Sequence, residues 1–149
     1  MRSGPASTRR WWSRSGIGRG SSQVGRGGKA SGAGSRTSKA LRRIATDAGL
    51  RIDINALRAA ISEDRAAGFK PACVIGTAGT VNTGAIDDLQ ALAKLAHEED
   101  IWFHVDGCIG ALIAIAPENA HRVAGIEWAD SIALDPHKWL HAPFEVGCA

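Results

Sequence analysis

The hydrophobic positions from Leu41 onward fall into short compact runs that are separated by polar or glycine-containing turns. Runs of this length, bounded by turn residues, are typical of strands that are covered on both faces of a sheet. They predict four strands, at residues 41–44, 72–75, 101–105 and 128–134.

Between the first two runs, the apolar positions follow helical spacing. Asp53 stands where a helix N-cap is expected, Gly68 stands where a helix stops, and Pro71 follows. We therefore predict a helix from about residue 54 to residue 66, whose apolar stripe is formed by Ile54, Leu57, Ala60 and Ile61.

Two further helices are expected along the chain. Asp87 and Asp88 favour the positive end of a helix that ends near Glu99, with an apolar stripe of leucines and Ala96. Pro117 opens a short helix through Val123. This alternation of strands and helices predicts an α/β domain with a mainly parallel sheet and crossover helices.

Residues 1–38 differ from the rest of the chain. They hold nine of the eighteen glycines, many Arg and Ser residues, and only scattered apolar residues, so we predict that this segment is disordered. The chain then divides into residues 1–38 and a folded part at residues 39–149.

Residues 1–46 carry eleven basic and no acidic residues, whereas residues 47–149 carry seven basic and fifteen acidic ones, a net charge of −8. Because the folded part is acidic, the basic balance does not indicate a nucleic-acid-binding fold.

Three explanations for residues 1–38 remain open. An organelle transit peptide fits the Arg and Ser content, although the glycines disfavour an amphipathic helix. An Arg-Gly tail could adhere to RNA, with Trp11 and Trp12 stacking on bases. We prefer a shifted reading frame or a misplaced start, which translation of the neighbouring nucleotide sequence in the other frames would reveal.

Two of the predicted strands end in residues that carry chemistry. Asp106 follows the strand at residues 101–105, and Lys138 follows the strand at residues 128–134, with Pro136 opposing a simple helical continuation. Adjacent parallel strands would bring both residues to the carboxyl edge of one sheet, where α/β folds bind ligands. An amine that can form a Schiff base, opposite a carboxylate that can hold a ring nitrogen protonated, suits pyridoxal phosphate.

Three blocks of sequence carry a resemblance to a known family. They are Gly76-Thr77-Ala78-Gly79-Thr80-Val81-Asn82-Thr83-Gly84-Ala85-Ile86-Asp87, His104-Val105-Asp106-Gly107, and Asp135-Pro136-His137-Lys138-Trp139-Leu140. Their order and spacing resemble those of the group II pyridoxal-phosphate-dependent amino acid decarboxylases, from about Leu41 to Cys148. The resemblance implies part of the large domain of fold-type I pyridoxal enzymes, with pyridoxal 5'-phosphate as the cofactor.

The resemblance also implies roles for individual residues. Lys138 would hold the cofactor as a Schiff base and Asp106 would keep its ring nitrogen protonated. Thr80 and Cys108 would lie near the cofactor, although most relatives have a small Ala at the position of Cys108. His137 would contact the cofactor or assist proton transfer, whereas an isolated His beside a Trp is more often structural. His104 is expected to be a packing or orienting residue.

The resemblance implies that this chain is a fragment of a homodimeric carboxy-lyase that acts on an L-amino acid and is a poor catalyst by itself. The cysteine spacing and the lack of a secretory or membrane-spanning pattern predict a cytoplasmic location. The substrate stays open. Two alternatives are another pyridoxal carbon–carbon lyase, similar to sphingosine phosphate lyases, and a non-catalytic fragment with an RNA-adhesive tail. We expect no metal at His137 and His141, no membrane span, and buried free thiols at Cys73, Cys108 and Cys148.

Overall fold

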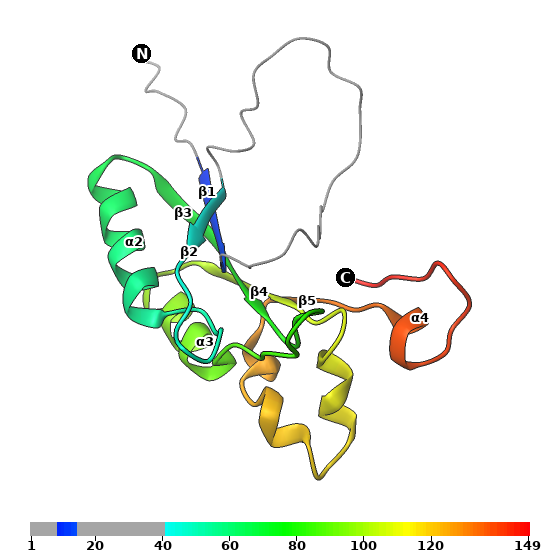
Figure 1. The fold of residues 1–149 in the computed structure, drawn as a ribbon. Helices are drawn as coiled ribbons and strands as arrows, with labels where there is room; N and C mark the ends of the chain where they lie inside the picture. Colours follow the sequence, from blue (N-terminus) through cyan, green and yellow to red (C-terminus); the bar gives the residue numbers. More distant parts are fainter. Residues whose placement is uncertain (1–8, 15–40) are drawn as a thin grey trace, which may run out of the picture.

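The computed structural model describes residues 9–14 and 41–149, in which strands and helices alternate around one sheet (Figure 1). The strands are β1 (Arg9–Arg14), β2 (Leu41–Ile44), β3 (Lys70–Thr77), β4 (Trp102–Asp106) and β5 (Ser131–Ala133). The α-helices are α2 (Ile54–Ala66), α3 (Leu89–Glu98) and α4 (Pro136–Trp139). Three short 3₁₀ helices follow β4, namely η1 (Ala111–Ile115), η2 (Ala120–Val123) and η3 (Ile126–Trp128).

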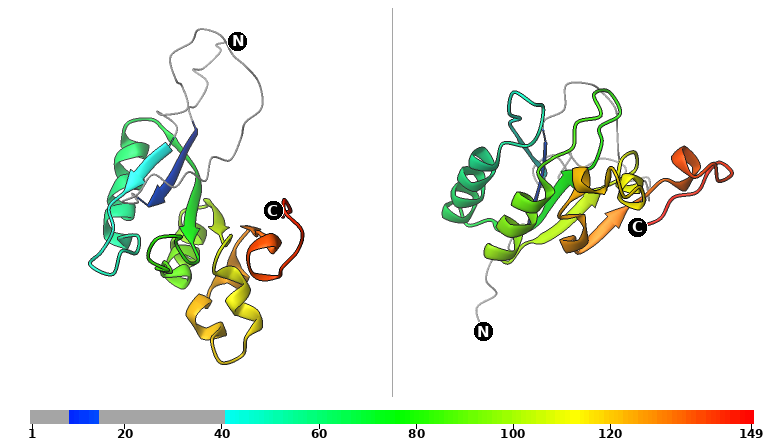
Figure 2. Two further views of the ribbon diagram at one scale, coloured as in Figure 1. Left: turned by 45° about the vertical axis from the view of Figure 1, so that its right-hand side comes forward. Right: turned by 90° about the horizontal axis from the view of Figure 1, so that it is seen from below.

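The five strands form one parallel sheet in the order β2-β1-β3-β4-β5. Its register places Thr77, Asp106 and Ala133 side by side, where β3, β4 and β5 end. Helices α2 and α4 lie at opposite ends of this sheet (Figures 1 and 2). The predicted α/β class with a mainly parallel sheet is therefore confirmed.

Strand β1 corrects part of the expected disorder. Residues 9–14 pair in parallel with both β2 and β3, although residues 1–38 were expected to have no ordered structure. The physical reason is that a central strand is held by backbone hydrogen bonds on both sides, which composition does not reveal. Residues 1–8 and 15–40, and with them most of the tail for which three explanations were open, lie outside the described residues.

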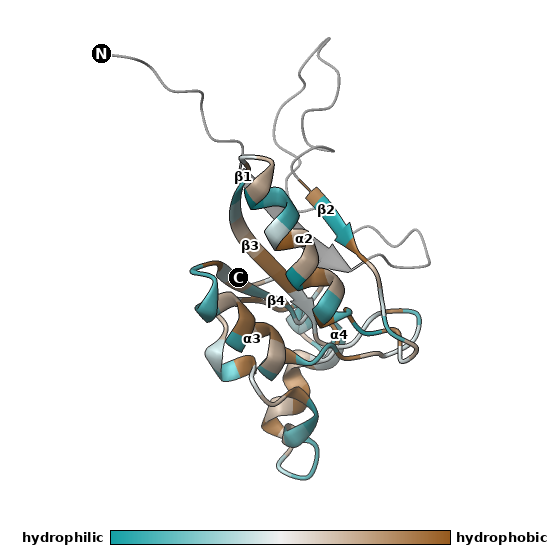
Figure 3. Cartoon of the chain, turned by 90° about the vertical axis from the view of Figure 1, so that its left-hand side faces the viewer, coloured by the Kyte–Doolittle hydropathy of each residue, from teal (hydrophilic) through white to brown (hydrophobic). Residues whose placement is uncertain are grey.

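Helices α2 and α3 cover one face of the sheet, and local sequence determines where each helix begins (Figure 3). The Asp53 side chain accepts hydrogen bonds from the backbone N–H groups of Asn55 and Ala56 and caps α2, while Asp88 caps α3 by accepting from the N–H of Ala91. The apolar stripes of both helices are buried against the sheet, most completely at Leu57, Leu89, Leu92 and Leu95. Each such side chain contributes about 1.5–3 kcal/mol to folding.

The sheet has two unlike faces. Val74, Gly76, Phe103 and Val105 form what we call the covered face, which packs on α3; a Cβ at Gly76 would lie only 2.8 Å from Leu92 Cδ1. On the other side, which we call the Asp106 face, alternation places Trp102, His104 and Asp106 together with Ile75, Thr77 and Ser131. Phe103 is fully buried, whereas the neighbouring Trp102 is 52% exposed.

The segment around β5 differs most from its prediction. The expected strand at residues 128–134 is reduced to Ser131–Ala133, because the chain turns through η3 until Trp128. The expected helix at residues 117–123 is confined to η2, after an unexpected η1. Pro136 does not oppose a helix but begins α4, since a proline at the first helical position lacks only an N–H that would have no helical partner. Leu134 and Cys148 then pair in an antiparallel bridge.

The three cysteines are free, as predicted, but they are not all buried. Cys73 is buried, Cys108 is partly exposed and Cys148 is exposed. Cys148 differs from its prediction because its bridge partner, Leu134, lies just beyond β5, the strand at the edge of the described sheet. Among the described residues, no helix combines the length and the apolar character that crossing a bilayer requires.

Candidate active site

Asp106 and Lys138 lie at the same edge of the sheet. Asp106 is the last residue of β4 and is opposite Ala133, the last residue of the adjacent parallel strand β5. Lys138 follows on α4, beyond the end of β5 (Figure 2). The sequence predicted both strand ends, but it placed Lys138 directly after its strand and not on a helical turn.

Lys138 has an ion-pair partner that the sequence analysis did not identify. Its Nζ lies 2.6 Å from Oδ2 of Asp135, and its side chain is 31% exposed. The hydrogen bond from Lys138 is the largest cause that lowers the pKa of Asp135, while burial opposes it and the thiol of Cys108 contributes a further hydrogen bond. The spacing of three residues across Pro136 is the feature of the sequence that could have indicated this pair.

Cys108 is within electrostatic reach of both carboxylates and of the lysine. Its backbone N–H donates to Oδ1 of Asp106 over 3.4 Å. The pKa of the Cys108 thiol is raised to about 12, first by burial, then by a hydrogen bond with Asp106 and by the negative charges of Asp106 and Asp135. The charge of Lys138 opposes this shift. The thiol is therefore protonated near neutral pH, and the four side chains form one cluster.

Two glycines allow close approaches in the loop after β4. A Cβ at Gly107 would lie 2.4 Å from the Cβ of Ala111, and a Cβ at Gly110 would lie 2.7 Å from the carbonyl oxygen of Ala78. The N–H of Gly110 also donates to that carbonyl over 2.8 Å. Gly110 therefore brings the loops after β3 and β4 into contact.

The loop from Gly76 to Gly84 is held largely by its own hydrogen bonds. The hydroxyl of Thr80 lies 2.6 Å from that of Thr83 and accepts from the N–H of Ala85 over 3.2 Å. In the described part of the chain, these bonds keep Thr80 within its loop and do not join it to Asp106 or Lys138. The expected approach of Thr80 to a cofactor stays a prediction.

Asp87 has a role that the sequence analysis missed. Only 3% of it is exposed, and its carboxylate accepts from the N–H of Ile52 over 2.7 Å and from the N–H of Thr77 over 2.8 Å. It therefore fixes the end of β3 next to the candidate site, whereas the helix N-terminus uses Asp88. The partner at Ile52 is 35 residues away, so no local pattern indicates it.

His137 is oriented by the segment that follows α4. Its Nδ1 lies 2.7 Å from the carbonyl oxygen of Val146, and its ring meets that of Phe144 edge-on at 5.1 Å. Because a carbonyl only accepts, Nδ1 carries a proton, and a neutral ring then has Nε2 as its acceptor. Within the described residues, no three His, Cys, Asp or Glu side chains gather as a metal site would require.

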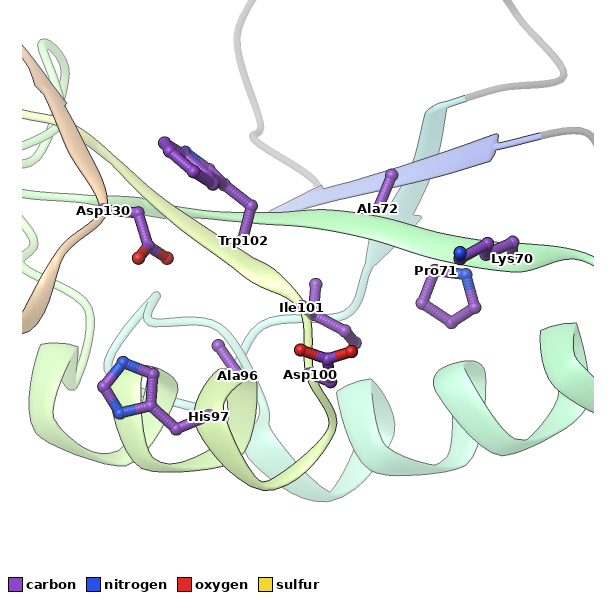
Figure 4. Close-up of a pocket in the computed structure, with 9 residues that line it drawn as sticks. All are labelled: Lys70, Pro71, Ala72, Ala96, His97, Asp100, Ile101, Trp102 and Asp130. Atoms are coloured by element: carbon purple, nitrogen blue, oxygen red, sulfur yellow. The ribbon is translucent and has the colours of Figure 1, made fainter.

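A separate hollow of about 440 Å³ lies at the opposite, amino edge of the sheet (Figure 4). It is lined by the starts of β3 and β4 and by the end of α3, and Figure 4 shows Lys70, His97, Asp100 and Asp130 around it. None of the predicted site residues lines it. Because ligands of parallel α/β sheets bind at the carboxyl ends of the strands, we place the candidate site at the Asp106 edge.

Comparisons with a family model and with curated proteins point to the same family. Residues 21–149 match the family described as the pyridoxal-dependent decarboxylase conserved domain. An aromatic-L-amino-acid decarboxylase from Bacillus atrophaeus is 51% identical over 106 residues, which are 71% of this chain and 22% of that protein. A tryptophan decarboxylase from Camptotheca acuminata is 42% identical over 110 residues, again 22% of its length. The chain thus spans about a fifth of the length of these curated relatives.

Solved structures agree with the sequence comparison. The tryptophan decarboxylase of Catharanthus roseus, in complex with L-tryptophan, has a TM-score of 0.69 and 38% identity, covering 74% of this chain and 24% of that one. The glutamate decarboxylase domain of a Vibrio parahaemolyticus protein also has a TM-score of 0.69, with 37% identity over 73% of this chain and 24% of that one.

Proposed function

Because this chain belongs to the pyridoxal-dependent decarboxylase family, we propose that it forms the cofactor-binding core of an enzyme that decarboxylates an L-amino acid with pyridoxal 5'-phosphate. One observation carries the proposal: Asp106 ends β4, and Lys138 lies on α4, which follows the adjacent parallel strand β5, so that the charges of both residues act on Cys108. A second pyridoxal carbon–carbon lyase activity is not proposed, since the relatives named above are decarboxylases.

The residues at this edge fit the cofactor. Pyridoxal phosphate supplies an aldehyde that bonds to a lysine amine and a ring that accepts the electron pair left by the departing carboxyl group. The cluster offers the amine of Lys138, the carboxylate of Asp106 and the neutral thiol of Cys108, with the hydroxyl of Thr80 on the neighbouring loop. These are the donor types that an aromatic aldehyde with a basic ring nitrogen requires.

Each side chain has a separate task in this proposal. Asp106 would hold a proton on the ring nitrogen of the bound cofactor, since a carboxylate next to a protonated nitrogen forms a charge-assisted hydrogen bond. Lys138 would hold the aldehyde through its amine, and the ammonium that pairs with Asp135 would have to lose a proton before it could do so. His137, with its Nδ1–H donated to Val146, presents Nε2 as a group that accepts and returns a proton.

We further propose an aromatic L-amino acid as the substrate class, because the relatives from Bacillus atrophaeus and Camptotheca acuminata are named for aromatic substrates. A homodimeric assembly, as the family resemblance implies, and a cytoplasmic location are also proposed. Sedimentation of the purified protein would test the dimer. Release of an aromatic amine from L-tryptophan, compared with release of an amine from L-glutamate, would test the substrate class, and a preference for glutamate would contradict it.

Covalent attachment of the cofactor tests the central proposal. The purified chain is incubated with pyridoxal phosphate, reduced with borohydride and digested, and the modified peptides are identified by mass spectrometry. We expect modification mainly at Lys138, and its loss in Lys138→Ala. Lys94→Ala is the matched control, because Lys94 is 74% exposed on α3 and only 3.9 Å from Glu98. Equal modification of Lys94 and Lys138 would contradict the proposal.

A further inference from the structure

Three side chains on the Asp106 face form a hydrogen-bonded chain between β4 and β5. Nε1 of Trp102 lies 2.9 Å from Oγ of Ser131, and Nδ1 of His104 lies 2.7 Å from the same oxygen. His104 and Ser131 are opposite each other in the register of the two strands. Ser131 is therefore the shared centre of the chain.

The direction of these hydrogen bonds follows from the donors. An indole N–H can only donate, so the Ser131 oxygen accepts from Trp102. Among the described residues, the other partner of the Ser131 hydroxyl is Nδ1 of His104. The Ser131 hydroxyl therefore donates its proton to Nδ1 of His104. A neutral imidazole that accepts at Nδ1 carries its own proton on Nε2.

This tautomer matters for Asp106. His104 precedes Asp106 by two residues on the same strand face, and the charge of Asp106 acts on the imidazole. A cationic His104 would place a positive charge next to the carboxylate of Asp106. It would then compete for that carboxylate with any cation bound there. Burial lowers the pKa of His104, although the charge of Asp106 opposes that shift.

Among the described side chains, the other titratable groups near His104 add no positive charge. On β3, the buried Cys73 has its pKa raised to about 11 by burial, so its thiol is neutral near pH 7. Immediately before Ser131, the carboxylate of Asp130 accepts from the N–H of Phe103 over 2.7 Å. The state of His104 therefore depends mainly on burial, on Asp106 and on the hydrogen bond to Ser131.

We propose that Ser131 is a positioning residue which, together with Trp102, holds His104 in the neutral Nε2–H form, so that Asp106 keeps its full negative charge for a bound cationic ring. If His104 were protonated at Nδ1, this nitrogen could no longer accept the hydrogen bond from the Ser131 hydroxyl. In the described part of the chain, that hydroxyl has no other acceptor. The identity of the ring rests on the proposed function, whereas the state of His104 does not.

The test reads the imidazole directly. In the chain labelled with ¹⁵N-histidine, two-bond ¹H–¹⁵N correlations distinguish the tautomers, and His104→Gln assigns the signal. We expect Nε2–H for His104 in the wild type. In Ser131→Ala, we expect the pKa of His104 to rise by about one unit, a tenfold change in proton affinity, and Ser131→Thr to restore the wild-type titration by restoring the hydroxyl. The exposed His97 serves as the internal control.

A second measurement links His104 to cofactor retention. We expect Ser131→Ala to retain pyridoxal phosphate like the wild type at alkaline pH and about tenfold less well below the raised pKa of its His104, where the imidazole is cationic. An Nδ1–H wild-type tautomer, or an unchanged His104 titration in Ser131→Ala with native circular dichroism, would overturn the inference. If the wild type itself takes up no cofactor, the proposed function fails, while the tautomer measurement still decides the role of Ser131.

Discussion

Alternate residues of β4 belong to two different regions of the molecule. On the covered face, Phe103 and Val105 are fully buried among the apolar side chains of the core. On the Asp106 face, Trp102 is half-exposed, and His104 is hydrogen-bonded to a residue of the next strand. One side of a five-residue strand therefore contributes stability, while the other side positions polar groups, and mutations on the two sides should have separable effects.

The largest expected difference is between two neighbouring aromatic residues. Phe103→Ala should lower the free energy of unfolding by about 3–5 kcal/mol, because it leaves a cavity in the core. Trp102→Ala should cost about 1 kcal/mol, since the side chain is 52% exposed and loses mainly one hydrogen bond. Urea unfolding measures both values. Equal losses would contradict the division of β4 into two faces.

Alkylation of Cys108 tests the charge cluster on the Asp106 side. With a pKa of about 12 in place of 9.0, the thiolate is about a thousandfold scarcer at pH 8, so iodoacetamide should modify Cys108 far more slowly than the exposed Cys148. The Cys108 rate should rise tenfold per pH unit up to about pH 11. Asp106→Asn should speed the alkylation by lowering the pKa of the Cys108 thiol. Fast labelling of Cys108 in the wild type at pH 8 would argue against the cluster.

Asp106→Asn should separate binding from folding. It keeps the oxygen that accepts from Cys108 but removes the charge, so we expect retention of pyridoxal phosphate to fall by about 10- to 100-fold, the value of one charge-assisted hydrogen bond. Dialysis followed by absorbance measures the retained cofactor, and thermal unfolding should change little. Asp100→Asn, at the opposite edge of the sheet, is the control that should retain the cofactor fully. A similar loss in both variants would count against a specific role for Asp106.

A single methyl group on the covered face tests how closely α3 packs on the sheet. Gly76→Ala would place a Cβ 2.8 Å from Leu92 Cδ1 and should destabilise the fold by about 1–3 kcal/mol. Gly147→Ala meets its nearest atom, Oδ1 of Asp135, only at 3.5 Å and should change stability by less than about 0.5 kcal/mol. Chemical denaturation compares the two, and a neutral Gly76→Ala would show that α3 packs less closely than described.

Local sequence predicted much of the fold. The helix at residues 54–66 begins after the Asp53 cap and ends as expected, because caps and apolar stripes act within one or two turns. The strand ends at Asp106 and near Lys138 were also predicted, and with them the sheet edge that carries the candidate site. Pro136 was misjudged, since the same residue ends one helix or begins another according to the path of the chain.

Apart from Asp135, which lies three residues from Lys138, the residues that escaped prediction have a partner far away in the sequence. Asp87 accepts from Ile52 across 35 residues, and Ser131 joins Trp102 and His104 across 29 and 27 residues. Strand β1 was missed for the same reason, because its place between β2 and β3 depends on pairing with both. No window of neighbouring residues contains these relationships.

The sequence by itself determined which chemical groups this protein has and where its helices begin, because backbone propensity and capping depend on adjacent residues. Only the tertiary structure decided that β4 lies between β3 and β5, which of its side chains face the core, and that Asp135 and Cys108 lie beside Lys138. The reason is that strand order and register are fixed by the packing of the whole sheet, and a shift of one residue would turn every side chain to the opposite face.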